Sequence, residues 1–372
     1  MRTIIVDLAP KDVIKEDLDD RLSELENLVN TYGSLVVVKK VQRKDFPDYK
    51  TFIGSGKLEE IRILADELNV ELIIIGNILK PAQIFNINTY LRKNKSKAQA
   101  WDRVDLILNI FDLHTVTPEA KLQIELAKIK HMGPSIFHMG GQELSKQGAG
   151  IGTRGRGETN IEIMKRHLRE KEYKILERLK VYKKTRSEHR KSRKRQDFKT
   201  IGVVGYTNAG KSSLMNVLTK KGVLSEDKLF ATLGTSVGKV FIDDGNLGQE
   251  FLVNDTIGFI RDLPPELIKA FLSTLEDSIE SDLLLHVVDA SSYKIEERIN
   301  IVDNILSKIE AVQSRIYVFN KTDLLTFEQI EELKIKFNHL NPVFISAEEK
   351  IGIKELKERI FKELNRESLS NF

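Results

Sequence analysis

The segment Gly205–Ser212 constrains this chain most, because it fits the phosphate-binding pattern G-x-x-x-x-G-K-[ST] without a mismatch. An apolar run, Ile201–Val204, precedes it, and a helix-compatible segment, Ser213–Leu218, follows it. A strand that leads into a helix directs backbone N–H groups and the positive end of the helix dipole at phosphate. The pattern therefore predicts a doubly wound α/β domain with a nucleotide at the carboxyl edge of its sheet. The residues expected around the phosphates are Gly205, Tyr206, Thr207, Asn208, Ala209, Gly210, Lys211, Ser212 and Ser213.

Individual residues of this segment and of two later ones have expected roles in phosphate and magnesium binding. Lys211 would reach the β- and γ-phosphates, and the Ser212 hydroxyl would bind Mg²⁺. The segment Asp255-Thr256-Ile257-Gly258 ends another strand, so that Asp255 would hold Mg²⁺ through water and the Gly258 N–H would contact the γ-phosphate. Thr232, within Phe230-Ala231-Thr232-Leu233, is the candidate for a switch threonine that ligates Mg²⁺ only in the triphosphate state, with Thr235 as the alternative.

The segment Asn320-Lys321-Thr322-Asp323 narrows the nucleotide to GTP. Asp323 could accept hydrogen bonds from N1–H and N2–H₂ of guanine, and adenine lacks both donors. Asn320 and Lys321 would brace the base and the phosphate loop. Ser346, Ala347 and Glu348 follow the last strand-like run, where a backbone N–H could contact guanine O6.

Phe259 and Asn208 bear on hydrolysis. Many GTPases have a glutamine after the Gly258-type glycine to orient the attacking water, and phenylalanine cannot form that hydrogen bond. Intrinsic hydrolysis is therefore expected to be slow, on the order of 10⁻⁴ to 10⁻² per second by analogy with slow GTPases. Asn208 is a candidate ligand for a K⁺ ion that bridges the phosphates. Lys211, Thr232, Gly258 and Asn208 are thus the predicted catalytic residues.

The first part of the chain alternates strand-like and helix-like segments, which favours a largely parallel sheet covered by helices. The predicted strands are Thr3–Leu8, Leu35–Val41, Leu72–Ile75 and Val104–Phe111, and the predicted helices are Asp17–Tyr32, Lys57–Leu68, Pro81–Leu91 and Pro118–Lys130. Gly54–Lys57 precedes one helix and is either an ordinary turn or a second phosphate loop. The expected domains are 1–155, ending in a glycine-rich loop, a basic helical linker 156–198, a nucleotide-binding domain 199–365 and a tail 366–372.

Between these domains the sequence predicts a loop and a charged helix. Glycines recur from Gly133 to Gly157, which predicts a long loop in which Arg154 and Arg156 could approach phosphates. An apolar stripe then follows at helical spacing, which suits a helical hairpin or an interdomain seam; its members are Ile161, Met164, Leu168, Ile175, Leu179 and Tyr182.

Positive charge is concentrated in the same region. Residues 156–199 hold 17 Lys/Arg against 7 Asp/Glu, whereas the whole chain has a net charge of only +4. The basic runs after Tyr182 are either a solvated face or, as we favour, a surface for nucleic acid. The chain has no cysteine, which excludes disulfides and thiolate sites and allows a reducing cytoplasm. Its apolar runs are of strand length, so no segment is expected to span a membrane. A cytoplasmic location and a monomeric state are separate expectations.

Four segments resemble the HflX family of translation-associated GTPases: Thr51–Ile61, Lys121–Ala127, Lys146–Thr159 and Asp255–Pro264. The resemblance implies binding to the large ribosomal subunit, where the glycine-rich loop approaches ribosomal RNA near the peptidyl transferase centre. It also implies GTP hydrolysis stimulated by ribosomal particles, the splitting or rescue of stalled ribosomes, and a hydrophobic residue at position 259. Two departures are Arg156, where the family has proline, and Gly234, where an aspartate is common.

Other functions are compatible with the same motifs. An RNA-remodelling NTPase could hold a second nucleotide at Gly54–Lys57, and ATP binding by residues 1–198 alone would favour it. A ribosome assembly GTPase and a signalling switch with a protein partner are further alternatives. GTP-dependent co-sedimentation with ribosomal subunits separates the leading interpretation from a protein-binding switch.

Overall fold

The structure is a computed structural model of the chain, and it describes residues 1–115, 117–147, 160–195, 199–219, 236–243, 248–255, 258–261 and 281–365. The chain divides into two compact units. The first combines Met1–Leu113 with Lys121–Val181, and the second combines His114–Ala120 with Tyr182–Phe372. Among the described helices, none has the length and apolar character that a membrane crossing requires.

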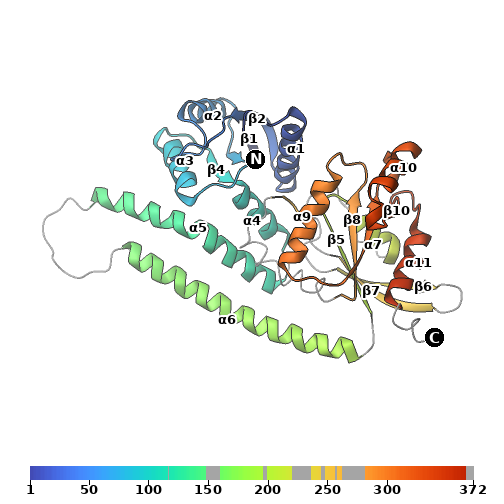
Figure 1. The fold of residues 1–372 in the computed structure, drawn as a ribbon. Helices are drawn as coiled ribbons and strands as arrows, with labels where there is room; N and C mark the ends of the chain where they lie inside the picture. The colour runs from blue at the N-terminus through green and yellow to red at the C-terminus, as the bar shows by residue number, and fades with distance from the viewer. Residues whose placement is uncertain are drawn as a thin grey trace. The chain divides into compact units, whose positions relative to one another are not determined.

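The first unit contains the predicted parallel sheet (Figure 1). Its strands lie in the order β2-β1-β3-β4, and every neighbouring pair is parallel. All of β3 is buried, as expected of a central parallel strand covered by helices. The elements are β1 (Arg2–Ala9), α1 (Lys15–Thr31), β2 (Leu35–Arg43), α2 (Ser55–Glu67), β3 (Leu72–Ile75), α3 (Pro81–Lys93) and β4 (Gln99–Asp102).

The predicted strand Val104–Phe111 was wrong, because these residues form helix α4 (Arg103–His114). Asp102 and Asp105 start the helix by reciprocal hydrogen bonds: the Asp105 N–H donates to Asp102 Oδ1 over 2.8 Å, and the Asp102 N–H donates to Asp105 Oδ2 over 3.4 Å. Most of the helix is buried, so its sequence shows an apolar run instead of a helical period.

A pair of long helices, α5 (Pro118–Gln147) and α6 (Asn160–Arg195), follows α4. The predicted loop from Gly133 was wrong at its start, since α5 continues to Gln147. The two helices lie side by side (Figure 1): Lys171 Nζ is 2.6 Å from Glu125 Oε1, and a Cβ on Gly133 would lie 4.0 Å from Leu168 Cδ1. Packing against α6 therefore supports a segment whose glycines and proline lower its own helix propensity. Residues 148–159 lie outside the described residues.

The second unit is built on a sheet of order β10-β9-β8-β5-β7-β6, in which only the described pair β6–β7 is antiparallel. Its strands are β5 (Thr200–Gly205), β6 (Ser236–Asp243), β7 (Gly248–Asp255), β8 (Leu283–Asp289), β9 (Ser314–Asn320) and β10 (Val343–Phe344). Its described helices are α7 (Lys211–Thr219), α9 (Ile295–Lys308), α10 (Phe327–Lys336) and α11 (Ile353–Leu364), with short 3₁₀ turns η1 (Thr322–Leu324) and η2 (Asn338–Leu340). The parallel strands, separated by helices, confirm the doubly wound α/β prediction.

Candidate functional site

The loop between β5 and α7 has a backbone that depends on its glycines. Gly210 has φ +87°, and a Cβ there would lie 2.1 Å from Asn320 Nδ2. Gly205 has φ +155°, and a Cβ there would lie 2.3 Å from the Val287 carbonyl oxygen. Asn208, which is exposed, also has a left-handed conformation with φ +61°. Larger residues at either glycine would displace the loop from its neighbours.

Lys211 begins α7 and is almost completely buried, with 7% of its surface exposed. Its Nζ donates to the Tyr206 carbonyl oxygen over 2.8 Å, so the side chain lies back over the loop. A Cβ on Gly258 would lie 2.7 Å from the same Nζ. The ammonium group, the helix N-terminus and a bare backbone at Gly258 thus surround one place, which favours an anion. Ser212 and Ser213 lie half-buried in the first turn of α7.

Phe259 is attached to this loop through its backbone. Its N–H donates to the Gly205 carbonyl over 3.0 Å, and its carbonyl accepts from the Thr207 N–H over 2.7 Å. The Phe259 side chain is 3% exposed and is therefore packed into the protein. Tyr206 adds a second connection, because its hydroxyl accepts from the Arg261 N–H over 3.1 Å.

Asn320, at the end of β9, connects the loop to the end of the sheet. Its Nδ2 donates to the Ala209 carbonyl over 2.9 Å, and its Oδ1 accepts from the Ala347 N–H over 3.0 Å. Lys321 has φ +67°, and its Nζ lies 2.8 Å from Asp289 Oδ2. Asp323 lies in η1 with its side chain exposed. These contacts bring the carboxyl ends of β5, β8 and β9 together.

The segment Ser346–Glu348 forms a turn beside Asn320. The Ser346 hydroxyl accepts from the Glu349 N–H over 3.1 Å, and the Ser346 and Ile351 backbones exchange hydrogen bonds. Ser346 and Ala347 are buried, whereas Glu348 is exposed. The structure therefore places the described predicted residues at one edge of one sheet.

Several predicted residues lie outside the described residues: Phe230, Ala231, Thr232, Leu233, Thr235, Thr256 and Ile257. Asp255 ends β7, where it pairs with Val203 of β5, one strand away from the loop. Its backbone position is known and its side chain is outside the described set. The sequence reasoning missed Asp289, although its place at the end of a buried parallel strand was a usable signal.

The structure gives Gly54–Lys57 the geometry of an ordinary helix start. The Gly54 N–H donates to Gln42 Oε1 over 2.9 Å, and Gly54 has φ −64°. Lys57 Nζ lies 2.5 Å from Glu60 Oε2, so the lysine is held by a carboxylate on the same helix. This arrangement favours a turn over a second phosphate loop.

Four family models match successive parts of the chain. Residues 19–112 match a model described as GTP-binding GTPase N-terminal, and residues 114–193 match GTP-binding GTPase Middle Region. Residues 200–321 match 50S ribosome-binding GTPase, and residues 286–365 match the C-terminal region of the MMR_HSR1 domain. The matched regions together extend over both units.

Several relatives that match most of this chain are named GTPase HflX. GTPase HflX of Caldanaerobacter subterraneus subsp. tengcongensis is 39% identical over 351 residues, which is 94% of this chain and 78% of the relative. GTPase HflX of Escherichia coli is 36% identical over 95% of this chain and 80% of the relative. That of Methanocaldococcus jannaschii is 37% identical over 94% and 85%, respectively.

Solved structures show that the fold of this chain is also similar to that of known proteins. The crystal structure of the SsGBP and GDP complex aligns with a TM-score of 0.57 at 25% identity, over 99% of this chain and 100% of that chain. A GTP-binding protein from Sulfolobus solfataricus in complex with GDP aligns with a TM-score of 0.51 at 25% identity, over 98% and 99%. Both titles describe guanine-nucleotide complexes.

Proposed function

Because the chain belongs to the HflX family of GTPases, we propose that it is a GTP-driven switch whose triphosphate form binds the large ribosomal subunit. The observation that carries this proposal is the double hydrogen bond of Asn320, which joins the phosphate loop at Ala209 to the turn at Ala347. The arrangement supports a single site for the candidate phosphate and guanine contacts. Residues 200–321 match the model described as 50S ribosome-binding GTPase, which supports the ribosomal partner.

The proposed contacts follow from chemistry and position. Lys211 Nζ, which donates to the Tyr206 carbonyl in the loop, is assigned to the β- and γ-phosphates. Asp323 accepts from the guanine donors and the turn Ser346–Glu348 lies on the side of O6, while Asn320 and Lys321 hold these parts together.

The residues at this edge also suit Mg²⁺, which prefers oxygen ligands. Ser212 follows Lys211 in the first turn of α7, and Asp255 ends the strand paired with β5. The Ser212 hydroxyl would hold the ion directly and Asp255 through water, with Thr232 joining in the triphosphate state. The bound ion supplies positive charge to the phosphates, and the chain positions them between Lys211 and Gly258.

Hydrolysis by the isolated protein is proposed to be slow. The Phe259 side chain is packed away from solvent, so it does not orient water at the γ-phosphate. Asn208, exposed in the loop, is proposed to bind K⁺ and so add positive charge. A turnover assay with Na⁺ in place of K⁺ tests this: a loss of rate is expected, and equal rates would remove Asn208 from the mechanism.

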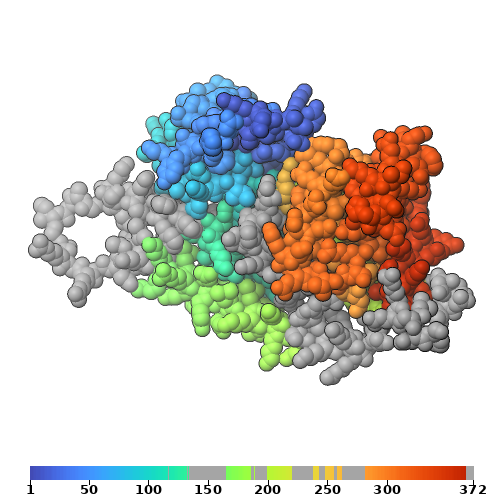
Figure 2. All heavy atoms as spheres, in the orientation of Figure 1, coloured from blue at the N-terminus to red at the C-terminus, as the bar shows by residue number. Residues whose placement is uncertain are grey.

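The contact with ribosomal RNA is assigned to α6 and to the segment that joins it to α5. Lys183 and Lys184 are exposed on α6, and the described part of this helix (green) lies at the surface in Figure 2. Arg190, Lys191, Arg193, Lys194 and Arg195 extend the charge along the same helix, while Arg154 and Arg156 lie in the connecting segment. Each phosphate contact should contribute a slope of about −0.7 to −0.9 to log affinity against log salt.

The biological outcome we propose is the splitting or rescue of stalled ribosomes by a cytoplasmic monomer. The test measures GTP hydrolysis with and without purified large subunits, beside light scattering of intact ribosomes. We expect the rate to rise with large subunits and scattering to fall with GTP. A stimulated rate with unchanged scattering would replace splitting by an assembly role, and an unstimulated rate would overturn ribosome-dependent activation.

A further inference from the structure

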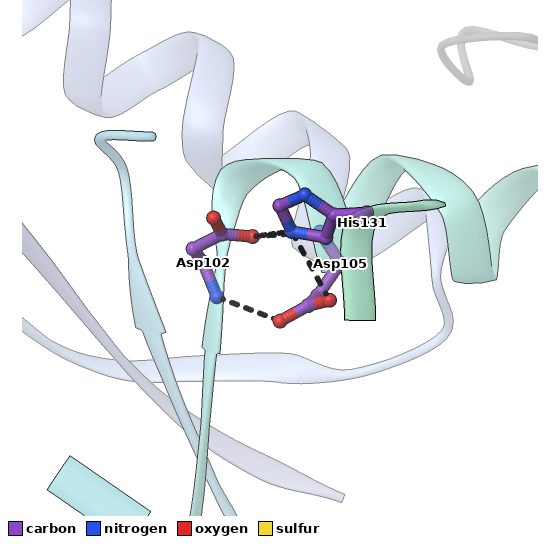
Figure 3. A group of neighbouring side chains, drawn as sticks. All are labelled: Asp102, Asp105 and His131. Atoms are coloured by element: carbon purple, nitrogen blue, oxygen red, sulfur yellow. Dashed lines mark hydrogen bonds and ion pairs between the residues drawn. The ribbon is translucent and has the colours of Figure 1, made fainter. Parts of the chain in front are cut away.

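Three side chains that could bind a metal converge at the carboxyl edge of the first sheet (Figure 3). Asp102 ends β4, Asp105 lies in the first turn of α4, and His131 comes from α5. His131 Nε2 lies 3.2 Å from Asp102 Oδ1 and 3.5 Å from Asp105 Oδ1. None of these residues belongs to the proposed nucleotide site.

These separations are those of ligands around one small ion. A tetrahedral ion with nitrogen and oxygen ligands at about 2.0–2.1 Å places neighbouring ligand atoms about 3.3 Å apart. All three candidate ligand atoms lie within 4.8 Å of one another. An ion between them therefore requires only small side-chain shifts.

The Asp102 carboxylate is oriented by the backbone. Its Oδ1 accepts from the Asp105 N–H over 2.8 Å, and its Oδ2 accepts from the Leu79 N–H over 3.1 Å. Each carboxylate oxygen has two lone pairs, so Oδ1 keeps one for an ion. Outer hydrogen bonds of this kind hold metal ligands in position.

Asp105 Oδ1 gives an independent sign of a ligand. The residue is 4% exposed, and within the described part of the chain this oxygen has no hydrogen-bond partner. Figure 3 shows it directed at His131. A buried carboxylate oxygen without a donor is unfavourable, and a cation would satisfy it.

The local charge also calls for a cation. Asp102 is 1% exposed and Asp105 is 4% exposed, so both carboxylates are shielded from water. Arg103, which lies between the two aspartates in the sequence, pairs with Glu24 of α1. His131 Nε2 is the described contact of both carboxylates, and an ion at this place would take Nε2 as its third ligand.

A cavity of about 400 Å³ reaches this cluster. Asp105 and His131 line it, together with Trp101, Phe85 and Asn88. The cavity gives an ion a route to the three ligands and leaves room for a water or a small ligand at a fourth position.

We propose that Asp102, Asp105 and His131 bind one divalent transition-metal ion of the Zn²⁺ type in the first unit. An imidazole with two carboxylates suits this class better than Mg²⁺ or Ca²⁺, which take oxygen ligands only. The bound ion joins α5 to the β4–α4 junction and thereby stabilises the base of the helix pair α5–α6.

The test uses the full chain saturated with Mg²⁺ and GDP, so that the nucleotide site is already filled. Trp101 is the single tryptophan, and it lines the cavity, so its fluorescence reports on the surroundings of this site. Zn²⁺ is titrated into the wild type and into Asp105→Asn and His131→Gln. Asp112→Asn is the matched control, because Asp112 pairs with Lys128 of α5 but lies outside the cluster.

We expect one Zn²⁺ per chain, a change in Trp101 fluorescence, and a rise of about 5 °C in the melting temperature when Zn²⁺ is well above its dissociation constant. Asp105→Asn and His131→Gln should weaken binding by about 100-fold or more, and Asp112→Asn should leave it unchanged. The proposal is overturned if Zn²⁺ leaves Trp101 unaffected, or if folded Asp105→Asn binds it as tightly as the wild type. In that case the cluster is only a contact between α5 and the β4–α4 junction. None of these measurements depends on GTP hydrolysis, so a failure of this proposal would not contradict the proposed function.

Discussion

Helices α2 and α7 each begin beside a glycine and a lysine, yet the two helix starts differ in backbone and surroundings. At α2, Gly54 has φ −64° and nothing lies within 4 Å of a Cβ built on Gly56. At α7, Gly210 has φ +87° and a Cβ would strike Asn320. Lys57 pairs with the carboxylate of Glu60, whereas the described partner of Lys211 in the loop is a carbonyl.

The difference shows what a phosphate loop requires in addition to a matching sequence pattern. The chain must turn through left-handed conformations that only glycine or asparagine adopts readily. The lysine must also keep its charge for an anion. In the loop, the Tyr206 carbonyl accepts from the ammonium group of Lys211, while Lys57 lies against the Glu60 carboxylate.

The largest effect is expected when Lys211 is removed, and the matched removal of Lys57 is the comparison. Lys211→Ala should lower kcat/KM for GTP by about 10²–10³-fold, because the charge that stabilises the transferred phosphoryl group is lost. Lys57→Ala should leave the rate unchanged. Steady-state hydrolysis of both variants measures this, and an equal loss in both would mean that α2 also contributes to the nucleotide site.

The next largest effect is expected for recognition of the guanine base, which is assigned to Asp323 near Asn320. Asp323→Asn should weaken GTP binding by about 100-fold and favour xanthine nucleotides, because the amide now donates where guanine donates. Glu331→Gln, which removes another exposed carboxylate nearby in the sequence, is the control. Competition titrations measure both, and unchanged GTP affinity in Asp323→Asn would contradict the assignment.

Glycine-to-alanine substitutions should change stability in opposite directions. Gly210→Ala should destabilise the second unit by about 1–3 kcal/mol, because φ is positive and the new Cβ meets Asn320. Gly56→Ala should stabilise the first unit by about 0.5–1 kcal/mol, because it lies in a helix with open space around it. Denaturant unfolding followed by circular dichroism and by Trp101 fluorescence separates the two units. Stabilisation by Gly210→Ala would show that its strained conformation is not needed.

The smallest effect is expected at Glu60. Hydrogen bonds from Lys40 and Lys57 hold the pKa of Glu60 below its usual 4.5. Its contribution to stability is therefore present above pH 4.5 and is lost as the pH falls below it. Glu60→Gln should lower the free energy of unfolding by less than about 1 kcal/mol at neutral pH and by nothing in acid. It should also create no GTP binding at α2, and a gain of binding would show that only Glu60 silences Lys57.

Much of the fold could be predicted from the sequence, because strand runs such as Leu72–Ile75 and Leu283–Asp289 are short, apolar and bounded. The errors have physical causes. Val104–Phe111 reads as a strand because α4 is buried on nearly all sides, and α5 passes Gly133 because α6 packs against it. Intrinsic helix and strand propensities reflect neither the burial of α4 nor the packing of α6 against α5.

The candidate sites differ in the same way. The phosphate loop is contiguous in the sequence, so its residues could be named in advance, although the carbonyl partner of Lys211 could not. The Asp102–Asp105–His131 cluster was missed because His131 is remote in the sequence and joins the aspartates only through the packing of α5.

Co-sedimentation with purified large ribosomal subunits tests the central claim most directly. The chain loaded with a non-hydrolysable GTP analogue should pellet with the subunits, while the GDP form and Lys211→Ala should remain in the supernatant. Equal pelleting of the GTP-analogue and GDP forms, or of Lys211→Ala, would contradict a nucleotide switch seated at Gly205–Ser212.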